Sequence, residues 1–154
     1  MKKLFIFYTL FLASIAWADI VDIKADHFYA SDLNHVAFFE GHAEIKQGAN
    51  YFKASKVTVY FNKNKKASKY EAKGKVTFDL TENSIHYKGK TERVVYSPNS
   101  SKYSFYGDVL LIDKTNNRRI KAETIELDLK TGLADIKGKK KKPVHFRFEI
   151  EDRK

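Results

Sequence analysis

The chain has 154 residues, a formal net charge of +10 at neutral pH, 43% hydrophobic residues and no cysteine. This length suits one domain with its own apolar core. The lack of cysteine excludes a disulfide framework and any thiolate metal or redox site. The basic balance favours an anionic partner.

The first 18 residues have the pattern of a secretory signal peptide. Two lysines precede an apolar stretch over residues 4–17, and Ala16-Trp17-Ala18 offers small residues at the two positions that signal peptidase recognises. The apolar stretch is shorter than the roughly 20 residues that a membrane-spanning helix needs. We therefore expect cleavage after residue 18, which leaves residues 19–154 as a single domain. For an exported chain, anionic lipid, phosphorylated glycolipid or cell-wall polymer is a more suitable partner than nucleic acid.

Alternating apolar and polar residues run through almost all of the remaining chain and predict antiparallel strands. In chain order, the expected strands are residues 21–30, 36–46, 51–61, 68–80, 84–97, 102–113, 118–130, 133–139 and 144–150. Segments rich in Asn, Gly, Ser and Pro separate them, which is typical of turns. No helical periodicity follows the leader, so we expect an all-β fold.

Two features recur with a shared period of about 33 residues, which indicates an internal repeat. A large apolar residue, a lysine and a very small residue stand together at Ile23-Lys24-Ala25, Phe52-Lys53-Ala54, Tyr87-Lys88-Gly89 and Ile120-Lys121-Ala122. Glycines inside alternating runs fall between these triplets, at Gly41, Gly74, Gly107 and Gly138. Each repeat is one pair of strands, which buries its apolar face only when it is stacked on its neighbours.

The end of each triplet interrupts the alternation, because the next large residue follows the small one three positions later and not two. This predicts a bulge or a corner, and glycines at one height favour a bend or a close approach of two sheets. We therefore expect a repeat-built antiparallel β jelly roll, that is, a folded-over, V-shaped pair of sheets with open ends.

The third repeat departs from the pattern. The repeat alignment puts Glu92 where the other repeats have Phe28, Val57 and Ile125. Because burying an unpaired carboxylate is costly, we expect a one-residue shift of register at this point rather than an inward-facing acid.

The apolar face of the strands either packs as a solid core or lines a groove. Its positions mix large aromatic residues with alanine and glycine at regular heights, which favours a groove with room between the sheets. A repeat stack without a capping helix leaves strand edges unpaired, and such edges pair with another chain. The last expected strand, residues 144–150, is a candidate for this junction.

Residues 39–48 and 52–60 resemble the OstA-like (LptA) family of periplasmic lipopolysaccharide-transport proteins. They read F-E-G-H-A-E-I-K-Q-G and F-K-A-S-K-V-T-V-Y, whereas the family reads F-x-G-N-V-x-V-x-Q-G and I-x-A-D-x-V-x-V. His42 and Ser55 depart from the usual asparagine and aspartate of the family, and neither is expected on the inward face. The resemblance extends over essentially the whole chain after the leader.

The resemblance implies a periplasmic, non-enzymatic protein that binds lipopolysaccharide, with the acyl chains of lipid A in an apolar groove and the sugars outside. It also implies stacking end to end with further copies, and with homologous domains of an inner-membrane export complex and an outer-membrane translocon. The groove-facing candidates are Phe28, Phe39, Ile45, Phe52, Val57, Val59, Phe61, Val76, Phe78, Tyr96, Phe105, Val109 and Leu127. The phosphate-contact candidates, expected near the groove rim, are Lys24, Lys53, Lys88 and Lys121; these lysines either meet lipid phosphates or serve only solubility and the protection of strand edges.

Other signals favour no further site. The five histidines have no metal-ligand spacing, and no nucleophile-and-base pattern is present, so we expect no metal, no cofactor and no enzymatic activity. The lysine run over residues 139–142 either binds phosphate groups or is a solvated loop.

Two alternatives stay open. In the first, the chain is an exported structural β-repeat module with a solid core, which binds anionic cell-wall or lipid surfaces through its basic outer face. In the second, the chain is the inner-membrane-anchored member of the same family, in which the segment of residues 1–18 is not cleaved.

Overall fold

The computed structural model describes residues 20–150, which form one antiparallel sheet of ten strands. The leader expected over residues 1–18 lies outside the described residues. The strands are β1 (Val21–Lys24), β2 (His27–Ser31), β3 (Val36–Gln47), β4 (Asn50–Phe61), β5 (Ala67–Glu82), β6 (Ile85–Ser97), β7 (Lys102–Asp113), β8 (Arg118–Asp128), β9 (Ala134–Lys137) and β10 (His145–Phe148). Residues 20–150 contain no helix that is long and apolar enough to cross a membrane.

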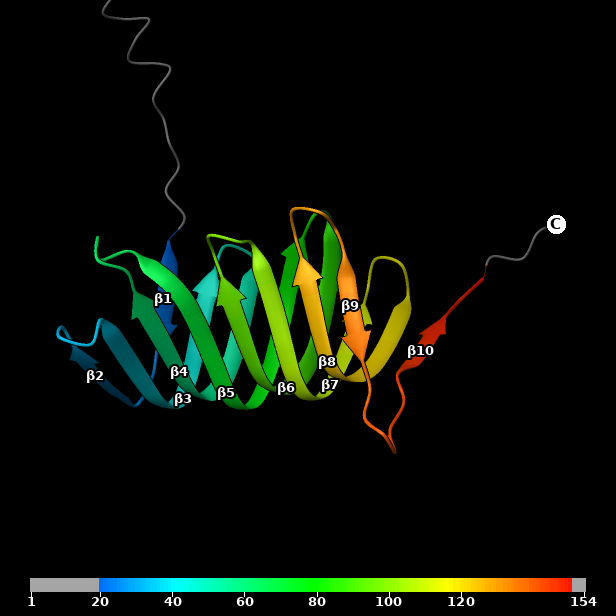
Figure 1. The fold of residues 1–154 in the computed structure, drawn as a ribbon, viewed down its shortest axis with the longest axis horizontal. Coiled ribbons are helices and arrows are strands. Elements are labelled where there is room, and N and C mark those ends of the chain that lie inside the picture. The colour runs from blue at the N-terminus through cyan, green and yellow to red at the C-terminus, as the bar shows by residue number, and fades with distance from the viewer. Residues whose placement is uncertain (1–19, 151–154) are drawn as a thin grey trace, which may run out of the picture.

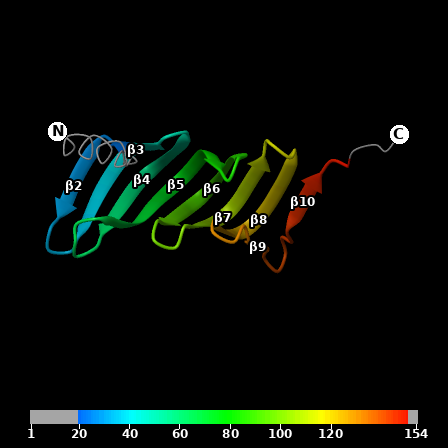
Figure 2. The ribbon, with the colours of Figure 1, turned by 90° about the horizontal axis from the view of Figure 1, so that it is seen from above.

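The long strands follow one another through the sheet in chain order. The order is β1-β3-β4-β5-β6-β7-β8-β10, while β2 also pairs with β3 and β9 also pairs with β8. Figure 2 shows these strands in a row along the long axis, with β2 near one end and β10 at the other. Because each strand pairs with its chain neighbour, the repeat in the sequence becomes a repeat along this axis.

Each long strand bends near its middle, and the bends form one line along the lower edge of the ribbon in Figure 1. At this fold line, two residues of β3, β5 or β7 oppose a single residue of the next strand, which makes a β-bulge. The first residue of each bulge is a glycine with positive φ: 82° at Gly41, 88° at Gly74 and 85° at Gly107. The glycine spacing in the sequence therefore marks the line along which the sheet folds.

The fold line divides the sheet into two arms. The β1 arm contains β1, β10 and residues 43–54, 76–91 and 109–122. The β2 arm contains β2, β9 and residues 36–40, 56–73, 93–106 and 124–128. Hairpin turns join the strands at the opposite edge of each arm, which we call the mouth (Figure 1).

The inward faces of the two arms pack against each other and form the core. Val57, Phe105 and Val76 have no exposed surface. Aromatic rings make contact from one arm to the other, with the centroids of Phe78 and Phe105 4.9 Å apart. The interior is therefore filled by side chains over its central part, and the room between the sheets that the sequence favoured is absent from the packed core of residues 20–150.

The third repeat follows a different alignment from the one expected. Val94 takes the inward position and is only 3% exposed, whereas Glu92 is exposed. The expected one-residue shift is therefore wrong; the shift is two residues, and the triplet of this repeat is Gly89-Lys90-Thr91. The reason is length, because the β1-arm part of β6 spans residues 85–91 and that of β4 only residues 50–54.

The expected first strand, residues 21–30, is in fact two strands. β1 and β2 both pair with β3, one on each side of its bend. Between them, the Asp26 N–H donates a hydrogen bond to the carbonyl of Gly41, 2.9 Å away. Because β3 bends at Gly41, each half of it has a partner strand of its own.

Candidate functional site

The groove-facing candidates all lie on the inward faces of the two arms. The buried ones are Ile45, Phe52, Val57, Val59, Val76, Phe78, Phe105 and Val109. Phe39, Phe61, Tyr96 and Leu127 are partly buried against them. Phe28 is 58% exposed, and its ring is tilted against that of Phe39 with the centroids 4.9 Å apart. The structure therefore brings this set together as one apolar interior.

The four candidate lysines lie on the outer face. In the pairs Phe52-Lys53 and Ile120-Lys121, the apolar side chain packs into the interior and the lysine is exposed on the other side of the sheet. Lys24, Lys53 and Lys121 stand beside the fold line, and Lys88 lies farther from it, 3.7 Å from Asp79. None of the four is at the mouth. Lys24, Lys53 and Lys121 lie near the opposite edge and Lys88 lies in between, away from the rim on which they were expected.

At the mouth, hydrogen bonds link the two arms. The Tyr103 hydroxyl of the β2 arm donates to Glu82 Oε1 of the β1 arm, 3.3 Å away, and Asn50 Nδ2 donates to the same oxygen at 2.7 Å. A second link runs from Asn83 Nδ2 to the carbonyl of Leu129, 3.1 Å away. The alternation put Tyr103 on the inward face, but no local signal in the sequence indicated its partner.

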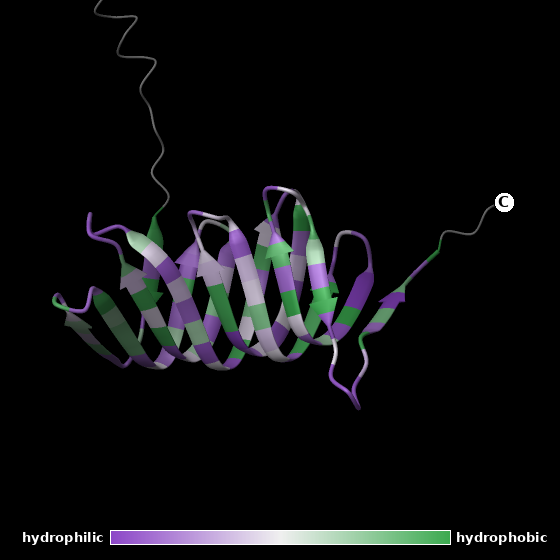
Figure 3. Ribbon diagram, in the orientation of Figure 1, coloured by the Kyte–Doolittle hydropathy of each residue, from purple (hydrophilic) through white to green (hydrophobic). Residues whose placement is uncertain are grey.

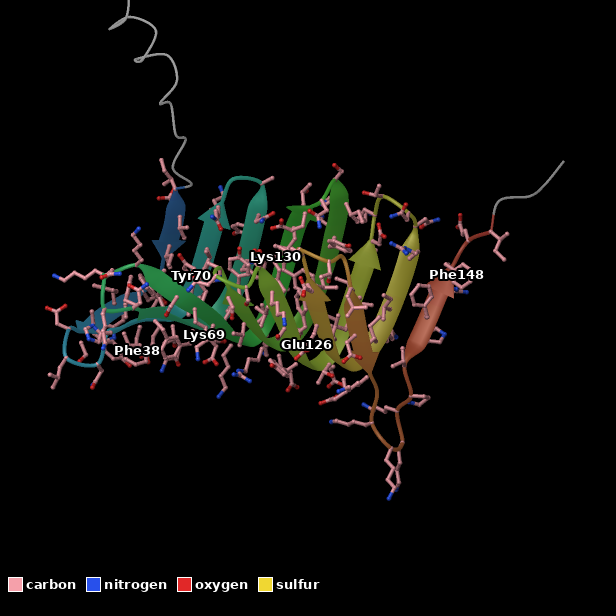
Figure 4. The ribbon with its side chains drawn as sticks, turned by 45° about the horizontal axis from the view of Figure 1, so that its top comes forward. Phe38, Lys69, Tyr70, Glu126, Lys130 and Phe148 are labelled. Atoms are coloured by element: carbon pink, nitrogen blue, oxygen red, sulfur yellow. The ribbon has the colours of Figure 1, made fainter. Side chains whose placement is uncertain are left out.

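A small cavity lies beside Tyr103, with a volume of about 30 Å³. This is about the space of one water molecule. Stacked tyrosines form part of its wall, with ring centroids 4.4 Å apart for Tyr96 and Tyr103 and 6.2 Å apart for Tyr70 and Tyr96. Figure 4 labels Tyr70 together with its neighbour Lys69, which points to the other face of β5. A ligand larger than a water molecule would enter this part of the interior only if the two arms part.

Tyr103 also makes stability depend on alkaline pH. Burial, with a smaller effect of the Glu82 carboxylate, raises the pKa of its hydroxyl well above the ordinary value. The unfolded chain therefore loses this proton from about pH 10 upward, while the folded chain keeps it. The contribution of Tyr103 to stability is complete below about pH 10 and declines as the pH rises above that value.

We expect Tyr103→Phe to lower the free energy of unfolding by about 1 kcal/mol at neutral pH. It should also flatten the loss of stability above about pH 10. Urea unfolding of both proteins between neutral and alkaline pH measures both effects. Tyr106→Phe, on the outer face, is the control; an equally steep alkaline loss in Tyr103→Phe and in the control would contradict the assignment.

The ends of the structure expose large apolar side chains. At one end these are Ile20, Phe28, Tyr29 and Leu33, and at the other Leu133, Val144, Phe146, Phe148 and Ile150. Among the described residues, β3 to β8 contribute none. Phe146 pairs with Ile120 of β8, so β10 extends the inward face of the β1 arm past its last covered strand (Figure 3). Both ends therefore combine apolar surface with strands that have one unpaired edge.

Within residues 20–150, no group of three or more acidic or histidine side chains is arranged to hold a metal ion.

These features define an uncapped β jelly roll with an apolar interior. The family of LptA and LptD N-terminal domain lipopolysaccharide (LPS) transport proteins matches residues 22–133, so the chain belongs to this family. The crystal structure of LptH, the LptA-homologous periplasmic component of the LPS transport device of Pseudomonas aeruginosa, has a TM-score of 0.73 and 13% identity. The match covers 85% of this chain and 96% of that chain and confirms the jelly-roll fold. No curated protein matches this chain in sequence.

Proposed function

We propose that this family member carries LPS in the periplasm, with the acyl chains between the two arms and the sugars outside. The observation that carries the proposal is the continuous apolar interior, which is bounded by the fold line on one side and by hydrogen-bonded turns on the other. About ten methylenes removed from water contribute roughly 8 kcal/mol. The interior can therefore hold a lipid without a charged contact, and the proposal includes no cofactor and no catalytic step.

Loading separates the two arms. The contacts that hold them together are apolar packing, such as Phe52 against Tyr103 with centroids 6.2 Å apart, and the hydrogen bonds at the mouth. Acyl chains replace the packing with contacts of the same kind. The strands stay paired on both sides of the bulges during loading, and the row of bulges along the fold line acts as the hinge.

The two ends connect carriers into a longer path. Exposed strand edges at β1 and β2 and at β9 and β10 suit β-strand addition, in which main-chain hydrogen bonds continue the sheet into the next subunit. Phe28 at one end and Phe148 at the other then become buried. The partners are further copies of the chain and homologous domains of an inner-membrane export complex, at the N-terminal end, and an outer-membrane translocon, at the C-terminal end.

A photo-crosslinking amino acid at Leu127 is expected to give an LPS adduct in cells, whereas one at Glu126 is not. Leu127 is partly buried on the inward face of β8, and Glu126, labelled in Figure 4, is exposed on the outer face one residue away. Immunoblotting for LPS reads out the result. Adducts at neither position, in a folded protein, would mean a permanently closed core and would favour a structural module that binds anionic surfaces from outside.

A further inference from the structure

A separate pocket lies on the outer face of the β1 arm, towards the C-terminal end. Its volume is about 600 Å³, within the range of about 300–1,000 Å³ that is typical of small-ligand sites. Its charged and titratable lining consists of the cations Lys90, Arg119, Lys121, Lys141 and Lys142, the carboxylates of Asp108 and Glu123, and His145. We call it the basic pocket; the sheet separates it from the apolar interior.

Strand pairing aligns part of this lining in one row. Lys90 of β6 pairs with Leu110 of β7, Leu110 with Lys121 of β8, and Lys121 with His145 of β10. Since neighbouring strands are about 4.8 Å apart, the row spans on the order of 14 Å from the backbone of β6 to that of β10. The half-buried Leu110 lies between the two lysines. The row therefore offers separated positive charges around an apolar centre.

The four-lysine run closes one side of the pocket as a hydrogen-bonded turn. The Lys139 N–H donates to the carbonyl of Lys142 at 2.8 Å, and the Lys142 N–H donates back at 3.1 Å. Lys139 Nζ is 3.3 Å from Glu123 and Lys142 Nζ is 3.7 Å from Asp108. The chain folds back tightly because Gly138 has no Cβ, which would stand 2.7 Å from the Lys142 carbonyl oxygen. The turn that Figure 1 shows below the fold line is therefore tied to the sheet.

Lysines of the turn form ion pairs with both carboxylates of the pocket, so the charge that is left unpaired in the pocket is positive. Glu123 pairs with Lys139, and Asp108 pairs with Lys142. Within the described residues, Lys90, Arg119, Lys121 and Lys141 form no ion pair. Cations gathered in one concave site repel one another and attract an anion.

The corresponding corner near the N-terminal end carries fewer cations. It also forms a hollow beside the fold line, of about 450 Å³, lined by Lys53 and Lys75. Lys53 Nζ there is 3.9 Å from Glu44, and no lysine turn covers the hollow. The repeat itself explains a hollow at each corner, whereas the larger group of cations without an ion pair, among the described residues, lies at the C-terminal corner.

We propose that the basic pocket binds a saccharide that carries more than one phosphate group. Lysine and arginine N–H groups form strong charge-assisted hydrogen bonds with phosphate oxygens, and the guanidinium of Arg119 can bind two of them at once. The spread of the row suits separated phosphates, and Leu110 with Pro143 offers apolar surface to a sugar ring. Because the pocket is outside the interior, this site does not depend on lipid carriage.

The test is a titration of the purified protein with a lipid-free phosphorylated oligosaccharide, with the same oligosaccharide after phosphatase treatment, and with the phosphorylated glycolipid in neutral vesicles. The protein should bind the phosphorylated forms and not the dephosphorylated one. Lys90→Glu/Lys121→Glu should weaken binding about tenfold or more, since each lost charged hydrogen bond is worth at least that factor. Lys141→Ser at the tip of the turn should weaken it as well, and it serves as a second variant that leaves the sheet untouched.

Lys63→Glu/Lys66→Glu, in the exposed turn between β4 and β5, makes the same charge change away from the pocket. Unchanged affinity in the pocket variants, an equal loss in this control, or equal binding after phosphatase treatment overturns the proposal. A loss for both ligand forms assigns the site to the sugar phosphates themselves, and a loss for the vesicle form alone assigns it to a lipid headgroup. The Leu127 adduct is expected to persist in Lys90→Glu/Lys121→Glu, so failure of this site and failure of lipid carriage are told apart.

Discussion

Replacing Phe105 with alanine is expected to lower the free energy of unfolding by about 3–5 kcal/mol. The side chain has no exposed surface and lies between Phe78 of the other arm, at 4.9 Å between centroids, and Tyr103, at 6.1 Å. Its removal leaves a cavity between two arms whose backbones are fixed by pairing to strands on both sides. Strand pairing within each arm keeps either backbone from collapsing locally into the space, so the loss should fall near the upper end of the range. Denaturant unfolding followed by circular dichroism measures it.

Phe148→Ala is the matched control for this substitution. Phe148 is 56% exposed on β10, and among the described residues its ring contacts the ring of Phe146 edge to face. We expect this change to cost less than about 1 kcal/mol in the monomer. If both substitutions had the same cost, the arms would not be packed against each other as the structure shows.

Gly74→Ala is expected to destabilise the fold by about 2–4 kcal/mol, through two effects that add. At φ 88°, the backbone of Gly74 is in a region that L-residues rarely adopt. A Cβ there would also stand 2.7 Å from the Cβ and the Oγ of Ser55 on the neighbouring strand. Thermal or urea unfolding of the variant measures the sum.

Two further variants separate these effects. Gly48→Ala introduces a Cβ at φ 57° with no atom within 4 Å, so it should show only the backbone cost of about 1–2 kcal/mol. Ser55→Gly removes the obstructing side chain and should recover part of the loss in Gly74→Ala. Without such recovery, crowding at the fold line would not be the reason for the glycine.

The faces of the strands and the fold line were predictable from the sequence. Alternation has a period of two, so Val57, Val76 and Val109 could be assigned to one face without knowing which strands pair. The glycine period marked the bulges at Gly41, Gly74 and Gly107, because a positive φ is tolerated best by glycine, but Gly138 has no positive φ and makes no bulge. The third repeat could not be aligned in this way, since two extra residues in the β1-arm part of β6 move Val94 into the place expected for residue 92.

The site was predictable only where it depends on the same alternation. The lysines could be assigned to the outer face, but alternation does not tell which end of a strand faces the mouth, so Lys53 and Lys121 were expected at the wrong edge. The link from Tyr103 to Glu82 joins residues of different strands and has no local signature. For the lysine run, the structure shows a hydrogen-bonded turn, and its phosphate binding stays a prediction.

The strict chain order of the long strands has a consequence for how the molecule is made. From β3 to β8, each strand finds its partner in the preceding one, across a short turn, so native pairing never waits for a distant segment. Contacts of this kind have a low entropic cost of loop closure, and arrays built from them can nucleate at any repeat and grow outward. A chain that becomes available to fold from one end can therefore fold hairpin by hairpin, each new strand joining an edge that is already in place.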